Sequence, residues 1–171
     1  AVLEAGLGTG LNALLTCLEA EKVQKHIRYV ALEAFPLSTA QADTLNYAGH
    51  LGEAAATILH QIHHSEWGQP VDISPWFTFE KRRIAFEDFE EAAAFDVVYF
   101  DAFAPNAQPE LWEAEVLGRM YRALREDGVF VTYCAKGAVK RCLKSLGFTI
   151  EALPGPPGKR EMTRGLKVTP A

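Results

Sequence analysis

The chain has 171 residues, a formal net charge of −5, and apolar and charged fractions of 49% and 23%. These values are typical of a globular domain with a sizeable core, and no apolar run approaches the roughly 18 residues needed to span a bilayer. Residues 136–171 contain eight basic and two acidic residues, so this tail carries +6 against −11 for the first 135 residues. The asymmetry favours a one-sided phosphate-binding surface, with a merely solvated helix face as the alternative.

Patterns typical of strands and helices alternate along the chain. Apolar runs predict strands at 1–5, 27–32, 95–100, 128–133, 148–153 and 161–168, and two short strands within 76–86. Helical spacing predicts helices at 11–21, after Pro36 with Ser38 as cap, at 40–67 with a break near Gly49 and Gly52, at 109–124 and at 136–146. The alternation predicts an α/β fold with a doubly wound, mostly parallel sheet that ends in an antiparallel C-terminal hairpin.

The ends of the sequence bear on its domain organisation. The first residue is not Met, and residues 1–5 already have the pattern of a buried strand. We therefore interpret residues 1–171 as a single domain that lacks an N-terminal segment.

Cysteine and histidine positions argue against a disulfide framework and a metal site. Cys17, Cys134 and Cys142 are odd in number and show no C-x-x-C spacing, which favours a reducing cytoplasm. His60 and His64 would share a helix face, but their polar segment carries no acid in an H-E-x-x-H pattern. We expect a solvated helix end there and no metal.

A glycine-rich turn near the start is the strongest chemical signal. It has the sequence Glu4-Ala-Gly6-Leu-Gly8-Thr9-Gly10-Leu-Asn12. Glycines after a strand let the backbone approach a ligand closely, and the following helix presents unpaired N–H groups. The G-x-G-x-G spacing differs from the G-x-G-x-x-G of dinucleotide folds. The preceding carboxylate would repel a pyrophosphate but suits the cationic ammonium and sulfonium of S-adenosylmethionine, so we predict that this cofactor binds the turn.

Acidic residues follow the second and third predicted strands. Glu33 ends the strand 27–32, where a carboxylate can accept hydrogen bonds from both ribose hydroxyls of a nucleoside cofactor. The alternative is an acid that only terminates the strand. Asp88 is the candidate for binding the adenine amino group, with Glu87 and Glu90 as rivals.

Asp101-Ala-Phe103-Ala-Pro105-Asn106 directly follows the apolar strand 95–100. Ligands of doubly wound sheets bind outside the carboxyl ends of the strands. The segment resembles the Asp-Pro-Pro-Tyr type motif of amino-methyltransferases, in which such an acid and backbone carbonyls turn the lone pair of an amine toward the methyl carbon. Phe103 is a candidate for stacking on an unpaired base. The alternative is a turn acid beside a core Phe, and Trp112 is expected in the core.

Three motifs together resemble the tRNA 5-methylaminomethyl-2-thiouridine-forming methyltransferases, a family found alone or fused to a flavin-dependent oxidase. The motifs are Glu4-x-Gly-x-Gly-Thr-Gly-Leu-Asn12, Asp101-x-Phe-Ala-Pro105 with Pro109-x-x-Trp112, and Gly158-Lys-Arg-Glu-Met162. The resemblance implies a class I, Rossmann-like S-adenosylmethionine-dependent fold and methylation of a 5-aminomethyl-uridine at the wobble position. It also implies that the glycine turn and Glu33 hold the cofactor, that Asp101 faces the acceptor amine, and that 159–162 lie near the substrate entrance. Leu7 departs from the expected Phe.

These inferences give a set of expected roles. Asp101 is the catalytic candidate, orienting the amine and taking its proton. The candidates for contact with the anticodon stem-loop of tRNA are Phe103, Pro105, Arg141, Lys159 and Arg160. We expect a cytoplasmic enzyme without membrane or metal partners, working with a separate or fused flavin oxidase. The alternatives are an aminopropyltransferase or small-amine methyltransferase, a nicotinamide oxidoreductase, and a non-catalytic module that binds an adenosyl ligand.

Overall fold

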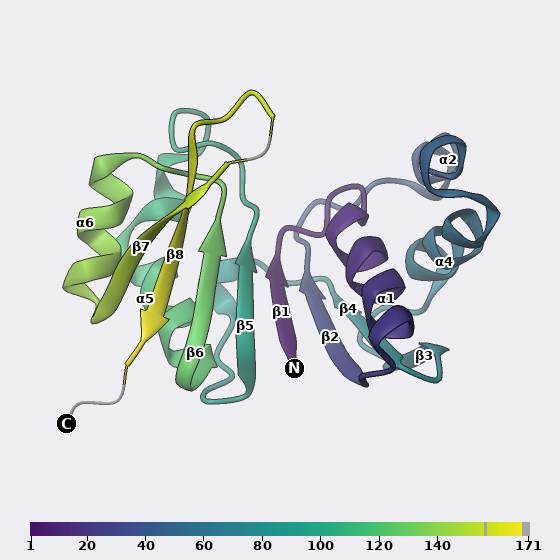
Figure 1. The fold of residues 1–171 in the computed structure, drawn as a ribbon, viewed down its shortest axis with the longest axis horizontal. Helices are drawn as coiled ribbons and strands as arrows, with labels where there is room; N and C mark the ends of the chain where they lie inside the picture. Colours follow the sequence, from purple (N-terminus) through teal and green to yellow (C-terminus); the bar gives the residue numbers. More distant parts are fainter. Residues whose placement is uncertain (156, 169–171) are drawn as a thin grey trace. The chain divides into compact units, whose positions relative to one another are not determined.

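A computed structural model describes residues 1–155 and 157–168. The chain divides into two compact units, Gly6–Ile84 and a second unit made of Ala1–Ala5 with Ala85–Ala171. Each unit is described below by itself, with elements labelled as in Figure 1. Within the described residues, the helices are too short or too polar to cross a membrane.

The unit Gly6–Ile84 packs helices against a short sheet. Its elements are α1 (Leu11–Val23), β2 (Ile27–Leu32), α2 (Thr39–Ala42), α3 (Ala48–Leu51), α4 (Glu53–His64), β3 (Val71–Ser74) and β4 (Phe77–Arg82). Strand β4 pairs in parallel with β2 and antiparallel with β3. Helix α1 packs against these strands and beside α4 (Figure 1). The fully buried rings of Tyr29, Phe77 and Phe79 fill the centre of this layer.

Local sequence explains the helices of this unit. The Ser38 hydroxyl accepts a hydrogen bond from the Gln41 backbone, and the Gln41 side chain accepts one from the Ser38 backbone. This capping box begins α2 where the sequence predicts a cap. Helix α4 places Ile58, Leu59 and Ile62 on its buried face, and Gly52 precedes it, as the predicted break requires.

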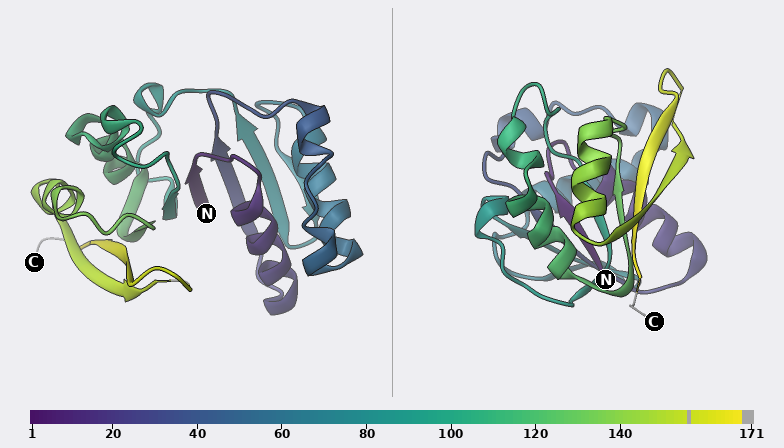
Figure 2. Two further views of the ribbon diagram at one scale, coloured as in Figure 1. Left: turned by 90° about the horizontal axis from the view of Figure 1, so that it is seen from above. Right: turned by 90° about the vertical axis from the view of Figure 1, so that its left-hand side faces the viewer.

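The second unit carries the remaining strands. Its elements are β1 (Val2–Ala5), η1 (Phe86–Asp88), β5 (Phe95–Phe100), η2 (Pro109–Trp112), α5 (Ala114–Ala123), β6 (Leu124–Thr132), α6 (Gly137–Ser145), β7 (Phe148–Pro154) and β8 (Glu161–Lys167). The strand order is β1-β5-β6-β8-β7, parallel from β1 to β6 and antiparallel beyond it. Helices α5 and α6 pack side by side against β6 and β7 (Figure 2). The core includes Phe100, Phe130 and Phe148, whose rings contact one another in succession at tilted angles.

The predicted α/β class, the parallel pairing and the C-terminal hairpin are confirmed. Of the two strands expected within 76–86, β4 lies there, but the second expectation is wrong in position, because β3 lies upstream of β4 and a turn at Pro75 and Trp76 joins them. The helix expected over 109–124 is split at Glu113, where the backbone is extended.

Candidate functional site

The glycine turn has the backbone conformation that the sequence predicts. Gly6, Gly8 and Gly10 have φ of 98°, 51° and 75°, in the left-handed region that glycine adopts without a Cβ clash. The Gly6 amide donates to the Leu32 carbonyl at 3.1 Å, which ties the turn to the end of β2. A Cβ placed on Gly8 would meet no atom within 4 Å. The turn therefore leaves open space beside Gly8 for a ligand.

Glu33 lies against this turn. Its Oε2 accepts a hydrogen bond from the Gly8 amide at 3.0 Å, and its Oε1 accepts one from the Phe35 amide at 2.9 Å. A carboxylate has about four acceptor positions, so two remain for the hydroxyls of a ribose. The open space and the oriented carboxylate fit the adenosyl part of S-adenosylmethionine.

Two side chains that the sequence analysis did not single out support Thr9. The Tyr47 hydroxyl donates to Thr9 Oγ1 at 2.7 Å, and His63 Nε2 donates to the Thr9 carbonyl at 3.0 Å. Burial lowers the pKa of His63, so the neutral imidazole is favoured. Asn12 stands at the start of α1, where its carbonyl accepts a bond from Thr16.

The remaining predicted cofactor residues belong to the second unit. Glu4 is fully buried in β1, in register with Tyr99 of β5. Asp88 is exposed at the end of the single turn η1, whose Phe86 packs on Phe100. Glu4 therefore lies in the first strand and Asp88 in a turn after β4. The contact of either residue with a cofactor stays a prediction.

Asp101 begins a loop in which two consecutive backbone carbonyls accept hydrogen bonds from side chains. The Tyr133 hydroxyl donates to the Ala102 carbonyl at 2.8 Å, and Trp112 Nε1 donates to the Phe103 carbonyl at 2.8 Å. Trp112 is buried, as predicted, and packs edge-on against Phe100. The Phe103 side chain is 71% exposed, so it is not a core residue. The loop thus presents an acid and an exposed ring from a rigid support.

A cavity of about 560 Å³ lies in the same unit. It is lined by Tyr133, Ala135, Lys159, Arg160 and Glu161. The Lys159 ammonium stands 4.1 Å from the centre of the Tyr133 ring, and Lys140 binds Glu161 at 2.6 Å. The predicted substrate residues Lys159 and Arg160 are therefore brought together beside the residue that holds the Asp101 loop.

Two other predicted substrate residues lie outside this lining. Arg141 is exposed on α6, and Pro105 is half-buried in the Asp101 loop. Neither contributes to the wall of the cavity. A role for either residue in substrate binding requires a ligand that extends beyond the cavity.

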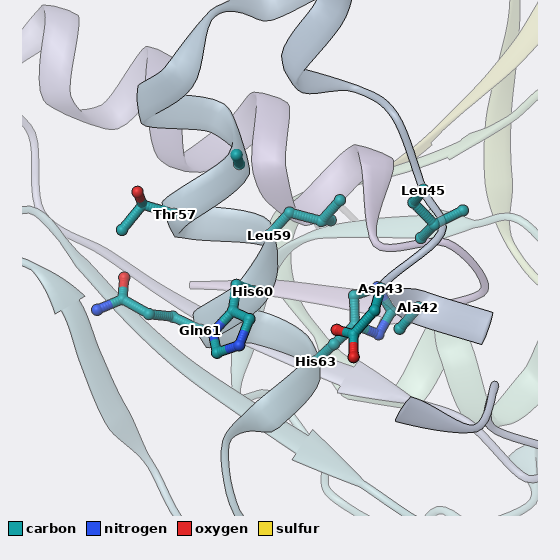
Figure 3. A pocket seen from close by; sticks show the side chains of 9 residues that line it. Ala42, Asp43, Leu45, Thr57, Leu59, His60, Gln61 and His63 are labelled. Atoms are coloured by element: carbon teal, nitrogen blue, oxygen red, sulfur yellow. The ribbon is translucent and has the colours of Figure 1, made fainter. Parts of the chain in front are cut away.

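A second cavity, of about 450 Å³, lies between α2 and α4 (Figure 3). Its lining includes Asp43, His60 and His63 but none of the predicted cofactor residues. Donor atoms of Asp43, His60 and His64 all lie within 4.8 Å of one another, a set that could hold a cation. Asp43 Oδ1 already accepts a bond from His64 Nε2 at 2.8 Å, which lowers the pKa of Asp43. This acidic partner is the residue that follows α2, so spacing within α4 could not reveal it.

Comparison with known proteins identifies relatives of this chain. A family model described as S-adenosyl-L-methionine-dependent methyltransferase matches residues 55–168. The tRNA 5-methylaminomethyl-2-thiouridine biosynthesis bifunctional protein MnmC of Hydrogenovibrio crunogenus is 30% identical over 96% of this chain. The protein of the same name from Magnetococcus marinus is 31% identical over 98% of it. The chain spans 26% of the length of each.

Solved structures share the fold at lower identity. MNMC2 from Aquifex aeolicus superposes with a TM-score of 0.76 at 21% identity, over 99% of this chain and 55% of that one. The 1,6-didemethyltoxoflavin-N1-methyltransferase of Burkholderia thailandensis, solved with S-adenosylhomocysteine, gives a TM-score of 0.57 at 16% identity, over 98% and 71%. These likenesses establish a methyltransferase fold.

Proposed function

The chain belongs to the family of S-adenosyl-L-methionine-dependent methyltransferases, and from this premise we propose that it methylates a 5-aminomethyl-uridine, with or without 2-thiolation, at the wobble position of tRNA. The observation that carries the proposal is the Asp101 loop, fixed by Tyr133 and bordered by the cationic cavity of Lys159 and Arg160. The names of the bifunctional relatives support the same substrate.

The cofactor is assigned first to the glycine turn and Glu33, which lie in the same unit. Bound S-adenosylmethionine supplies an electrophilic methyl group on a sulfonium. Glu33 would accept the ribose hydroxyls, because its two oxygens are already oriented by the Gly8 and Phe35 amides. The open side of Gly8 gives room for close backbone approach. The remaining assigned cofactor residues are Glu4, Gly6, Thr9, Gly10, Asn12 and Asp88.

The acceptor amine is assigned to Asp101. The carbonyls of Ala102 and Phe103 accept hydrogen bonds from Tyr133 and Trp112, which fixes the backbone next to Asp101 and so directs its carboxylate toward the amine. An aminomethyl group is largely protonated at neutral pH, so it must lose a proton before it can attack. Asp101 would orient the amine and receive that proton, and positioning supplies most of the remaining catalysis.

The tRNA is assigned to the exposed surface of the second unit. Phe103, with most of its ring exposed, would stack on the unstacked wobble base, with Pro105 beside it. Lys159 and Arg160 would bind phosphates near the acceptor, and Arg141 would bind a phosphate farther along the anticodon stem-loop. A tRNA substrate also implies a cytoplasmic location.

The proposal extends to domain organisation and to a functional partner. Residues 1–171 would form a single methyltransferase domain. The bifunctional relatives are about four times as long as the matched region, so a flavin-dependent oxidase, fused or separate, is the proposed functional partner.

The test is transfer of labelled methyl from S-adenosylmethionine to tRNA that lacks this modification, followed by nucleoside analysis. Labelled 5-methylaminomethyl-uridine is the expected product. Asp101→Ala should lower kcat by about a hundredfold or more while leaving S-adenosylhomocysteine affinity unchanged. Glu110→Ala, which removes an exposed acid of η2 in the same unit, is the matched control and should retain activity.

The competing functions give different results in the same assay. A labelled methyl group on an added small amine, with unlabelled tRNA, would indicate a small-amine methyltransferase. Cofactor binding without turnover of any acceptor would indicate a non-catalytic module. Equal loss of binding and turnover in Asp101→Ala would make Asp101 a cofactor ligand.

A further inference from the structure

Tyr133 connects three segments that are far apart in the sequence. It follows β6 directly, and its hydroxyl reaches across 31 positions to donate to the Ala102 carbonyl at 2.8 Å. Its ring lies edge-on to Trp112 with centroids 6.1 Å apart. The Lys159 ammonium stands 4.1 Å from the centre of the ring. The side chain thus contacts the Asp101 loop, the helix behind that loop and the basic segment near the cavity.

The hydroxyl is held in its donor state. Burial raises the pKa of Tyr133, and electrostatic interaction with Cys134 and Asp101 raises it further. A phenol that stays protonated keeps its hydrogen for the Ala102 carbonyl, so the bond persists over the working range of pH.

The segment that carries Tyr133 is itself fixed. The Cys134 amide donates to Thr132 Oγ1 at 3.2 Å, and Thr163 Oγ1 of β8 donates to the Cys134 carbonyl at 2.7 Å. Thr132 and Thr163 are buried. The phenol therefore projects from a support that does not depend on the loop it holds.

We propose that Tyr133 is a positioning residue for methyl transfer: its hydroxyl fixes the backbone next to Asp101, and its ring carries Lys159 at the cavity. The inference rests on the proposed function and deepens it. The Asp101 carboxylate needs a defined direction to orient an amine, and misplacement by about 1 Å can cost a hundredfold in rate. Lys159, held over the ring, would meet a phosphate next to the acceptor nucleotide.

Tyr133→Phe separates the two roles, because it removes the hydroxyl and keeps the ring. We expect kcat to fall about tenfold, equivalent to about 1.4 kcal/mol in the barrier, with KM for tRNA and affinity for S-adenosylhomocysteine within about twofold of the unmodified chain. Tyr133→Leu also removes the platform for Lys159 and should raise KM for tRNA as well. This split between kcat and KM distinguishes positioning from general destabilisation.

Tyr121→Phe is the matched control. Tyr121 lies in the same unit and also carries a lysine over its ring, with Lys167 Nζ 4.7 Å from the centroid. The substitution makes the same chemical change away from the Asp101 loop. It should leave kcat and KM unchanged.

Hydrogen exchange tests the inference without catalysis. Amides of residues 101–108 should exchange faster in Tyr133→Phe than in the unmodified chain, and Tyr121→Phe should show no such change. Unchanged exchange in this segment, or unchanged kcat, would overturn the positioning role. If the unmodified chain fails to methylate tRNA, the proposed function is wrong, and the exchange result then decides the role of Tyr133 by itself.

Discussion

Glu33 shows how one side chain can be prepared for a ligand before the ligand arrives. Both of its oxygens accept backbone N–H bonds, from Gly8 at 3.0 Å and from Phe35 at 2.9 Å. These bonds fix the direction in which the remaining lone pairs point. A ribose would then bind without a cost for ordering the carboxylate.

Glu33→Gln should weaken cofactor binding. An amide group has one acceptor oxygen and one donor nitrogen, so it can replace only one of the two backbone bonds and one ribose acceptor. A hydrogen bond to a charged group contributes about 1.5 to 3 kcal/mol, which predicts a loss of about 10- to 150-fold in affinity. Calorimetric titration with S-adenosylhomocysteine measures it. Glu19→Gln, an exposed acid on α1, is the control, and equal affinities in the two variants would remove Glu33 from the site.

Residues with a backbone requirement or a place at a strand end could be predicted from the sequence. The positive φ of Gly6 and Gly10 follows from the glycine spacing after a strand. Tyr133 and Tyr47 could not be found in this way. Their roles depend on hydrogen bonds to residues 31 and 38 positions away, and a lone tyrosine after a strand carries no signal of its partner.

At the scale of elements, the end of α4 supports the glycine turn. His63 Nε2 donates to the Thr9 carbonyl, and the Lys81 ammonium donates to the His63 carbonyl. Lys81 is 2% exposed and stands over the Trp67 ring. A change in the charge of His63 would therefore alter its hydrogen bond to the glycine turn.

This arrangement predicts a pH dependence of stability. The pKa of His63 is lowered from 6.5, first by burial and then by the charge of Lys81, while the Thr9 bond and Asp43 oppose the shift. As the pH falls, His63 therefore becomes protonated in the unfolded chain at a higher pH than in the folded chain. The stabilisation is complete above about pH 6.5 and is lost as the pH falls below it.

His63→Gln should reduce this dependence, because an amide keeps the donor to Thr9 but does not titrate. The slope of unfolding free energy between about pH 7 and pH 5 should fall, by at most about 1.4 kcal/mol per pH unit, since one proton is involved. Urea unfolding at several pH values measures the slope. His50→Gln, an exposed histidine in the same unit, should leave it unchanged. The same slope in all three chains would contradict the assignment.

The boundaries of a strand could be predicted from the sequence where the strand is strongly apolar, and could not be predicted where it is not. The run Phe-Asp-Val-Val-Tyr-Phe becomes β5 with the expected bounds. Strand β3 has only exposed and half-buried residues, so it gives no hydrophobic signal. Strand β6 begins at Leu124, four residues before the expected start, because Leu124 pairs with Phe95 through a register shift.

At the scale of the whole molecule, part of the positive tail is already neutralised. Lys140 binds Glu161 at 2.6 Å, and Arg164 Nε binds Glu151 at 2.8 Å. Lys167 is 9% exposed and donates to the Leu124 carbonyl at 2.8 Å. The candidates for phosphate contact are thus fewer than the eight basic residues of 136–171. The exposed ones are Lys136, Arg141, Lys144, Lys159 and Arg160.

This reduced set predicts a moderate salt dependence of tRNA binding. If about three to five phosphates are neutralised, a plot of the logarithm of the association constant against the logarithm of the salt concentration should have a slope of roughly −2 to −4.5.

Arg141→Gln should make the slope shallower by about 0.7 to 0.9 and leave kcat unchanged, because Arg141 lies outside the cavity wall. Fluorescence anisotropy with labelled tRNA measures both slopes. Lys22→Gln, on α1 and paired with Glu19, is the control. An unchanged slope in Arg141→Gln would exclude a phosphate at this residue, and a slope near zero for the unmodified chain would exclude the tail as the tRNA surface.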